Sequence, residues 1–172
     1  MHTTYLALGS NLGDRLLNLT QAIHEISKNI GQVSKTSQFY RTDPLNPASI
    51  KSQPEFLNAV IECVTDLNPS DLLRKVHEIE NLIGLDRNSK EYWGPRIIDI
   101  DILTYDAQII SDGDLILPHK EMLDRDFVLV PFEEIAPDFM HPVENKKISD
   151  LLLSLKARSS STYVIAPLVH AD

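Results

Sequence analysis

Two aspartates with one residue between them, Asp99 and Asp101, lie in an otherwise apolar stretch, Ile98-Asp99-Ile100-Asp101-Ile102-Leu103. Side chains alternate between the two faces of a β-strand, so both carboxylates are expected on one face and the isoleucines on the other, against a core. At a rise of about 3.3 Å per residue the aspartates start roughly 6.6 Å apart, and carboxylates at that span can converge on two metal ions about 3.5–4 Å apart. Hard oxygen ligands favour Mg²⁺ that carries substrate phosphates over zinc. The spacing therefore predicts a site for two Mg²⁺ ions.

The alternative is a half-buried strand whose aspartates simply face water. Aspartate is depleted in strands, and like charges side by side repel unless a cation offsets them, so we favour the metal interpretation. Just upstream, Gly94-Pro95 predicts a turn, and the guanidinium of Arg96 is a rigid donor that can bind a phosphate through two hydrogen bonds. Metal ligands and an anion-binding side chain are thus expected within six residues of each other.

Length, composition and charge restrict the class of protein. The chain has 172 residues, 42% apolar and 24% charged, which fits a single domain over residues 1–172. A formal net charge of −9 argues against a general nucleic-acid binder, which needs a basic face. No apolar run approaches the ~18 residues that span a bilayer, and the first residues do not look like a signal peptide, so a cytoplasmic protein is expected. The single cysteine, Cys63, falls in an apolar strand and is expected in the core.

The apolar periodicities predict an α+β chain. The expected elements are strands over Thr3–Leu8, Gln32–Arg41, Leu57–Val64 and from Ile98, and helices over Leu16–Ile30 and from Asn68 to Ile83. This order is that of the ferredoxin-like split βαβ, an antiparallel sheet with helices packed on it. Further along are an extra hairpin over Ile109–Leu117 with Asp112-Gly113 at its turn, C-terminal helices over Phe127–Ile135 and Ser149–Leu155, and a last strand over Tyr163–Ile165.

The segment Gly9-Ser10-Asn11-Leu12-Gly13-Asp14, between the first strand and the first helix, is rich in glycine. It lacks the lysine and the spacing of a phosphate-binding P-loop, so we interpret it as a tight turn followed by a helix N-cap.

The stretch Trp93-Gly94-Pro95-Arg96-x-x-Asp99-x-Asp101-Ile102-Leu103 resembles the signature of the hydroxymethyl-dihydropterin pyrophosphokinases of folate biosynthesis. The likeness continues in Leu8–Asp14, Phe39–Thr42, Phe56–Ala59, Pro118-His119 and Glu134–Pro137. The resemblance implies an enzyme that moves a diphosphate from ATP to 6-hydroxymethyl-7,8-dihydropterin and releases AMP, with two Mg²⁺ ions as cofactors. Its partners would be these small molecules and neither nucleic acid nor membrane, and a monomer is expected.

By the same resemblance, a group of residues forms the pterin site: Thr42, Pro44, Leu45, Phe56, Asn58, Trp93 and Phe127. Phe56 and Phe127 would stack on the two faces of the ring, and the amide of Asn58 would bind its edge, as a flat polar heterocycle requires. Phe127 could instead be the first apolar residue of the short helix. Phe56 stands where a tyrosine is common in the family, and Asp43 is a second departure.

The resemblance also implies an ATP site made of His77, Arg87, Lys90, Arg96, Ile102, Leu115, Leu117, His119, Lys120 and Arg125. Leu115 and Leu117 would flank adenine, while Arg96 and Arg125 would act in catalysis by holding phosphate charge. The family's Gly-Arg-x-Arg pattern after Gly84 is absent, which leaves Arg87 and Lys90 as the cations of that loop. His77 and His119 could equally be ordinary surface or satisfied histidines. The loops 43–53 and 85–92 are expected to be mobile and to close over the substrates.

Two other functions fit parts of this pattern. A two-metal phosphohydrolase or nuclease would also use Asp99 and Asp101. A ferredoxin-like module that senses a nucleotide without turnover would not need Phe56, Asn58 and Phe127 beside the aspartates.

Overall fold

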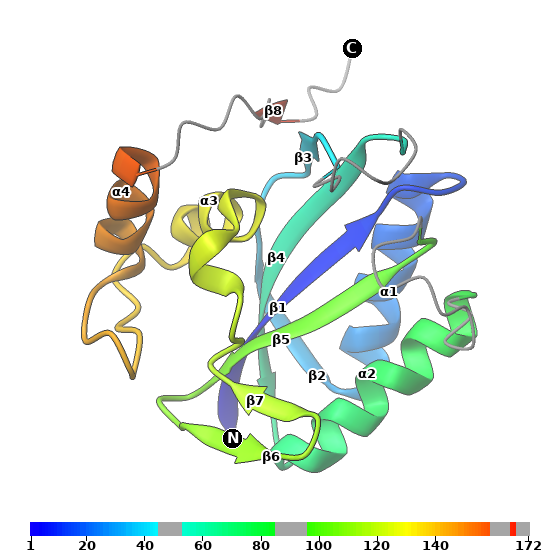
Figure 1. Cartoon of the computed structure of the whole chain (residues 1–172). Coiled ribbons are helices and arrows are strands. Elements are labelled where there is room, and N and C mark those ends of the chain that lie inside the picture. The colour runs from blue at the N-terminus through cyan, green and yellow to red at the C-terminus, as the bar shows by residue number, and fades with distance from the viewer. Residues whose placement is uncertain (45–52, 85–95, 159–165, 168–172) are drawn as a thin grey trace.

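A computed structural model of the chain describes residues 1–44, 53–84, 96–158 and 166–167 (Figure 1). Its elements follow in the order β1 (His2–Ser10), α1 (Arg15–Asn29), β2 (Gly31–Thr36), β3 (Tyr40–Thr42), β4 (Phe56–Thr65), α2 (Pro69–Ile83), β5 (Asp99–Tyr105), β6 (Ile110–Asp112), β7 (Leu115–Leu117), the 3-10 turn η1 (Met122–Asp124), α3 (Asp126–Ile135), α4 (Ile148–Arg158) and β8 (Ala166–Pro167).

The main sheet is antiparallel throughout. Strand β1 lies between β5 and β4, and both β2 and β3 pair along the other edge of β4, with the short β8 beside β3. This is the strand order of the split βαβ, so the predicted α+β, ferredoxin-like fold is confirmed. The hairpin β6–β7 forms a separate small sheet, with Gly113 at positive φ in its turn.

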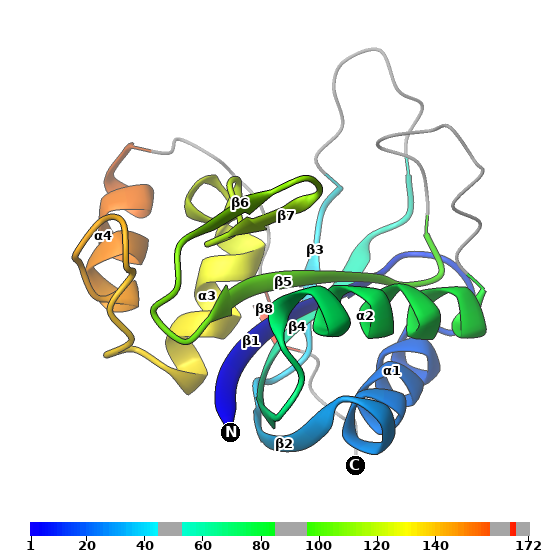
Figure 2. The same ribbon diagram turned by 90° about the horizontal axis from the view of Figure 1, so that it is seen from below.

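Helices cover both faces of the sheet. Helices α1 and α2 pack together on one face, whereas α3 packs on the other face and α4 packs against α3 (Figures 1 and 2). The alternation along β1 sets this arrangement, because Leu6 and Leu8 join the core beneath α1 and α2, whereas Tyr5 joins the core beneath α3 and α4. The extra hairpin and C-terminal helices are present as predicted.

The helices begin where the sequence indicates. The carboxylate of Asp14 accepts a hydrogen bond from the Leu17 amide and caps α1, and the side chain of Asn68 accepts one from the Asp71 amide and caps α2. Helix α2 ends at Gly84, whose φ of 116° is a conformation that favours glycine. Leu82, an apolar residue next to the last residue of α2, is 68% exposed.

The single strand predicted over Gln32–Arg41 is wrong, because the structure divides it into β2 and β3. Ser37 interrupts the pairing, since its amide donates to Val60 O while its Oγ accepts from Val60 N. The next amide, that of Gln38, donates to the carboxylate of Glu134 on α3, at 3.1 Å from each oxygen. A buried hydroxyl and a carboxylate from a distant helix thus take over hydrogen bonds that a continuous strand would make.

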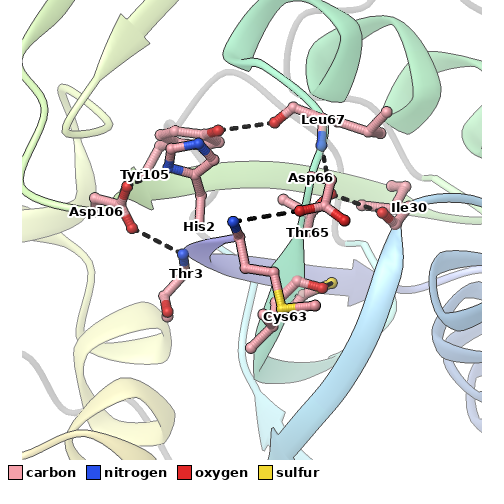
Figure 3. Close-up of polar contacts among 11 residues, drawn as sticks. His2, Thr3, Ile30, Cys63, Thr65, Asp66, Leu67, Tyr105 and Asp106 are labelled. Atoms are coloured by element: carbon pink, nitrogen blue, oxygen red, sulfur yellow. Dashed lines mark hydrogen bonds and ion pairs between the residues drawn. The ribbon is translucent and has the colours of Figure 1, made fainter.

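At one end of the sheet, residues of β1 and β4 make polar contacts with segments that flank other elements (Figure 3). The carboxylate of Asp106 accepts from the Thr3 amide at 2.8 Å and contacts His2 Nδ1 at 2.6 Å. Buried Thr65 donates its hydroxyl to Ile30 O at 2.7 Å and accepts from the Leu67 amide. These contacts hold the end of the sheet at which β1 begins.

Cys63 is fully buried, as predicted, and burial raises the pKa of its thiol to about 11. The strand predicted over residues 163–165 lies outside the described residues. Within the described part of the chain, no helix has the length and apolar character needed to span a bilayer.

Candidate active site

The face of the sheet beneath α3 is apolar at one end of the strands and polar at the other. Near the start of β1 it is apolar, with Tyr5, Val60 and Leu103 in the core beneath α3 and α4. At the other end of β1, Gly9 pairs with Asn58 of β4 on one side and with Asp99 of β5 on the other. The same alternation that buries the apolar end therefore brings polar side chains from both neighbouring strands to one place.

A cavity of about 350 Å³ opens over this polar end. It is lined by Ala7, Leu8, Gly9, Thr42, Asp43, Pro44, Gln53, Phe56, Asn58, Ala59, Arg96, Asp99, Asp101, His119, Lys120, Glu121, Arg125, Phe127 and Val128. These residues come from strands β1, β3, β4 and β5 and their flanking segments, from the segment between β7 and α3, and from the start of α3.

Asp99 and Asp101 project from one face of β5 into this cavity, while Ile98, Ile100 and Ile102 are at most 6% exposed in the core on the other face. The predicted alternation is therefore confirmed. The two aspartate side chains are 34% and 31% exposed.

Each aspartate has an arginine partner. Arg96 Nη1 lies 2.8 Å from Asp99 Oδ1, and Arg125 Nη1 lies 3.2 Å from Asp101 Oδ2. Arg125 also contacts Glu121 and lies over the ring of Phe127, with its Cζ 5.7 Å from the ring centroid. Both arginines are therefore placed at the aspartate pair.

Asp99 is strained electrostatically in spite of Arg96. Burial, and after it the negative charge of Asp101, raises the pKa of the Asp99 carboxyl, and the two guanidinium groups offset this only in part. A bound cation would relieve the same repulsion. The donor set fits Mg²⁺, which is commonly held by one or two carboxylates with substrate phosphates as the remaining ligands. Among the described residues, no group of three or more His, Cys, Asp or Glu side chains is placed to hold a metal ion.

His119 faces the same carboxylates. Its Nε2 lies 3.7 Å from Asp101 Oδ1, and its Nδ1 accepts a hydrogen bond from the Glu121 amide at 3.3 Å. Burial lowers the pKa of His119, although the charge of Asp101 opposes the shift. A neutral imidazole that accepts at Nδ1 carries its proton on Nε2, so His119 presents a hydrogen-bond donor to the cavity.

On the other side of Gly9, Asn58 is 7% exposed and its Nδ2 donates to the hydroxyl of Thr42 at 2.7 Å. This contact fixes which way the amide points. A Cβ on Gly9 would lie 2.8 Å from Asn58 Oδ1 and 3.8 Å from the ring of Phe56. The absence of a side chain at Gly9 is therefore what gives the Asn58 amide its space.

The model of the 7,8-dihydro-6-hydroxymethylpterin-pyrophosphokinase (HPPK) family matches residues 5–137. The chain belongs to the HPPK family. The family resemblance indicated by the sequence is thereby confirmed.

Individual relatives agree with this assignment. The 2-amino-4-hydroxy-6-hydroxymethyldihydropteridine pyrophosphokinase of Bacillus subtilis is 42% identical over 133 residues, 77% of each chain. Folic acid synthesis protein FOL1 of Dictyostelium discoideum is 39% identical over 151 residues, but the chain spans only 22% of its length. A crystal structure of Plasmodium falciparum HPPK-DHPS aligns with a TM-score of 0.70 at 18% identity, covering 91% of this chain and 45% of that one, and shows the fold.

The cavity of this HPPK domain contains much of the predicted site. It brings together Thr42, Pro44, Phe56, Asn58 and Phe127 from the pterin set, and Arg96, His119, Lys120 and Arg125 from the ATP set. Leu45, Arg87, Lys90 and Trp93 lie outside the described residues, as do residues 45–52 of one loop expected to close and the whole of the other, 85–92.

The cavity does not include every described residue of the ATP set. Ile102, Leu115 and Leu117 are at most 6% exposed and belong to the core beneath α1 and α2. His77 is a partly buried residue of α2 and does not line the cavity. Their contacts with ATP stay predictions.

The predicted site omitted several lining residues, among them Gly9, Gln53 and Glu121. The family resemblance covered Gly9, but the sequence alone suggested only a turn there. Its importance appears only when β4 and β5 are placed beside β1. Glu121 follows Pro118-His119, and nothing in its local sequence distinguishes it from a surface glutamate.

Charges in the cavity are close to balanced. Among the described lining residues, Arg96, Lys120 and Arg125 are cationic, and Asp43, Asp99, Asp101 and Glu121 are anionic. These groups alone give no net attraction for a polyphosphate. A cation at the aspartate pair would reverse the balance locally.

Proposed function

We propose that the chain transfers the diphosphate of ATP to the hydroxymethyl oxygen of 6-hydroxymethyl-7,8-dihydropterin, releasing AMP, in a reaction that needs Mg²⁺. The observation that carries this proposal is the row Asn58-Gly9-Asp99 across three strands, which sets a side-chain amide beside a carboxylate pair in one cavity. Strands lie about 4.8 Å apart, so the backbone positions of Asn58 and Asp99 are roughly 10 Å apart. A pterin bound at the amide could therefore extend its hydroxymethyl group toward the carboxylates.

The pterin would bind through stacking and edge recognition. Phe56 and Phe127 line the cavity from β4 and from α3, so they can contact a flat ring from two elements. Asn58 is oriented by Thr42, and its remaining hydrogen-bonding capacity is available to the edge of the ring.

The polyphosphate would bind on the other side of Gly9. Arg96 and Arg125 supply planar donors for phosphate oxygens, and His119 supplies an N–H donor. Asp99 and Asp101 would hold Mg²⁺, which supplies charge neutralisation for the phosphates when bound. The need for it follows from the balanced charges of the cavity without it.

The proposed chemistry forms a bond between the hydroxymethyl oxygen and the β-phosphorus of ATP. The bond between that phosphorus and the oxygen bridging the α- and β-phosphates breaks, this oxygen leaves with AMP, and the alcohol proton is released to water. His119 with its proton on Nε2 acts as a donor in this step and not as the base. Positioning and charge neutralisation dominate phosphoryl transfer, so the site does not depend on a strong base.

The experiment is a separation of products after incubation with ATP, Mg²⁺ and the pterin, with parallel mixtures lacking the pterin or containing excess chelator. The proposal predicts AMP and a pterin diphosphate in equal amounts, and neither product without the pterin or with the chelator. Phosphate release without the pterin would instead support a phosphohydrolase, and ATP binding with no product would support a sensor module.

A further inference from the structure

Asn11 lies in the segment between β1 and α1 that the sequence analysis explained only as a turn. It is 2% exposed, and its hydrogen bonds lead to two segments distant in sequence. A buried amide in a loop requires partners, and the identity of those partners indicates what the residue does.

One set of partners is the backbone of Arg96. The Arg96 amide donates to Asn11 Oδ1 at 2.6 Å, while the amides of Asn11 and Leu12 donate to Arg96 O at 3.0 and 3.1 Å. The peptide groups on both sides of the Arg96 Cα are therefore held by this one loop. This fixes the point from which the Arg96 side chain reaches Asp99.

The other set of partners lies where the chain enters β4. Asn11 Nδ2 lies 3.2 Å from Gln53 Oε1, which belongs to a cavity-lining residue, and 3.4 Å from Pro54 O. Arg15 reinforces the same place, since its Nη1 donates to Glu55 O at 2.7 Å. One side chain thus joins the Arg96 backbone to the segment that leads into Phe56 and Asn58.

The loop does not need Asn11 for its own shape. Asp14 caps α1, and Asn18 Nδ2 donates to Ser10 Oγ, to Leu12 O and to Ile97 O.

We propose that Asn11 is a positioning residue that sets Arg96 for phosphate binding and couples it to the Gln53 side of the cavity. The kinetic consequence rests on the proposed function, whereas the effect on Arg96 itself does not. Removal of the Asn11 side-chain amide would leave the backbone N–H of Arg96 without this acceptor, and the Arg96 side chain would become more mobile.

The test uses Asn11→Ala in the full chain, with Thr65→Val as the matched control. Thr65 is likewise 2% exposed and joins separate segments by hydrogen bonds, but at the end of the sheet drawn in Figure 3. Urea denaturation measures the stability of each variant. Heteronuclear NOE at Arg96 Nε, in the protein without ligands, measures the order of the guanidinium group.

We expect both substitutions to lower stability and only Asn11→Ala to lower the NOE of Arg96 Nε. An unchanged NOE in Asn11→Ala would overturn the inference, and this result is obtained whether or not the protein turns over ATP. If the protein turns over ATP, Asn11→Ala should raise KM for ATP about tenfold. This is the loss of affinity expected when one hydrogen bond between Arg96 and a charged phosphate is weakened. In an Arg96→Ala background the same substitution should leave KM unchanged, and a further rise there would also contradict a role through Arg96.

Discussion

Asn58 and Asp99 lie in one row of the sheet, each paired with Gly9 from opposite sides. The residue between them has no side chain, and a Cβ at that position would lie 2.8 Å from Asn58 Oδ1. The spacing between the amide and the carboxylate pair is thus set by backbone pairing, while the space above Gly9 is set by the absence of a single atom.

This relationship predicts that Gly9→Ala displaces the Asn58 amide. The hydrogen bond between Asn58 Nδ2 and Thr42 Oγ1 would be distorted, and KM for the pterin should rise about tenfold with little change in KM for ATP. Gly113→Ala is the control, because its φ of +56° makes any side chain unfavourable but no atom lies within 4 Å of the added Cβ. Steady-state kinetics should show a pterin effect only for Gly9→Ala, and equal effects of both variants would contradict the explanation.

Asp99→Asn should lower turnover at least ~10³-fold and yet stabilise the free protein. The direction of the stability change follows from the raised pKa of Asp99. Above the unfolded-state pKa, ionisation of this carboxyl costs more free energy in the folded protein than in the unfolded chain, so removal of the charge raises Tm at neutral pH.

Asp106→Asn provides the opposite case. Burial acts to raise the pKa of Asp106, but the hydrogen bonds with Thr3 and His2 and the nearby positive charges together lower it. Its charge therefore stabilises the folded state above the unfolded-state pKa. This variant should lose Tm and keep its turnover. Scanning calorimetry of both variants checks the pair, and a loss of Tm in Asp99→Asn would show that its repulsion with Asp101 is outweighed by the Arg96 contact.

Phe56→Ala and Phe127→Ala should each weaken pterin binding about tenfold or more and spare ATP, because stacking contributes roughly 0.5–1.5 kcal/mol beyond the burial of the ring. Phe127 has a second role, as Arg125 lies over its ring. Calorimetric titration with each substrate measures the effects, and unchanged pterin affinity in both variants would exclude the sandwich.

His119 should titrate below the ordinary histidine value, since burial lowers its pKa. Between the folded-state pKa and the unfolded-state pKa near 6.5, His119 is more often protonated in the unfolded chain than in the folded protein. His119 therefore makes the free energy of unfolding rise as the pH increases across this range and fall as the pH decreases. His119→Gln should flatten this part of the stability curve. The test is denaturation midpoints across pH 5 to 7 with NMR titration of the imidazole, and a His119 pKa above 6.5 would disprove the assignment.

The parts of the fold that depend on local pattern were predictable from the sequence. The alternation around Asp99 and Asp101, the caps at Asp14 and Asn68 and the stop at Gly84 each follow from neighbours within a few residues. The interruption at Ser37 was not predictable, because it depends on Val60 and on Glu134, which is far along the chain.

The site divides in the same way. Residue chemistry indicated Asp99 and Arg96, and the family resemblance indicated Asn58. The contribution of Gly9 required knowledge of strand register, and that of Asn11 required knowledge of which segments meet around it. Leu115 and Leu117 are buried because the hairpin packs against the core. Their apolar character alone is compatible both with a place in the core and with a contact to adenine.

The most direct test of the proposed reaction traces the oxygen atom that bridges the α- and β-phosphates of ATP into the products. ATP labelled with ¹⁸O at the bridge between the α- and β-phosphates is incubated with the enzyme, Mg²⁺ and 6-hydroxymethyl-7,8-dihydropterin, and the products are analysed by ³¹P NMR and mass spectrometry. Attack on the β-phosphorus predicts that the label remains with AMP, formed one for one with an unlabelled pterin diphosphate. ADP with a pterin monophosphate, or AMP without the label, would contradict diphosphate transfer at this site.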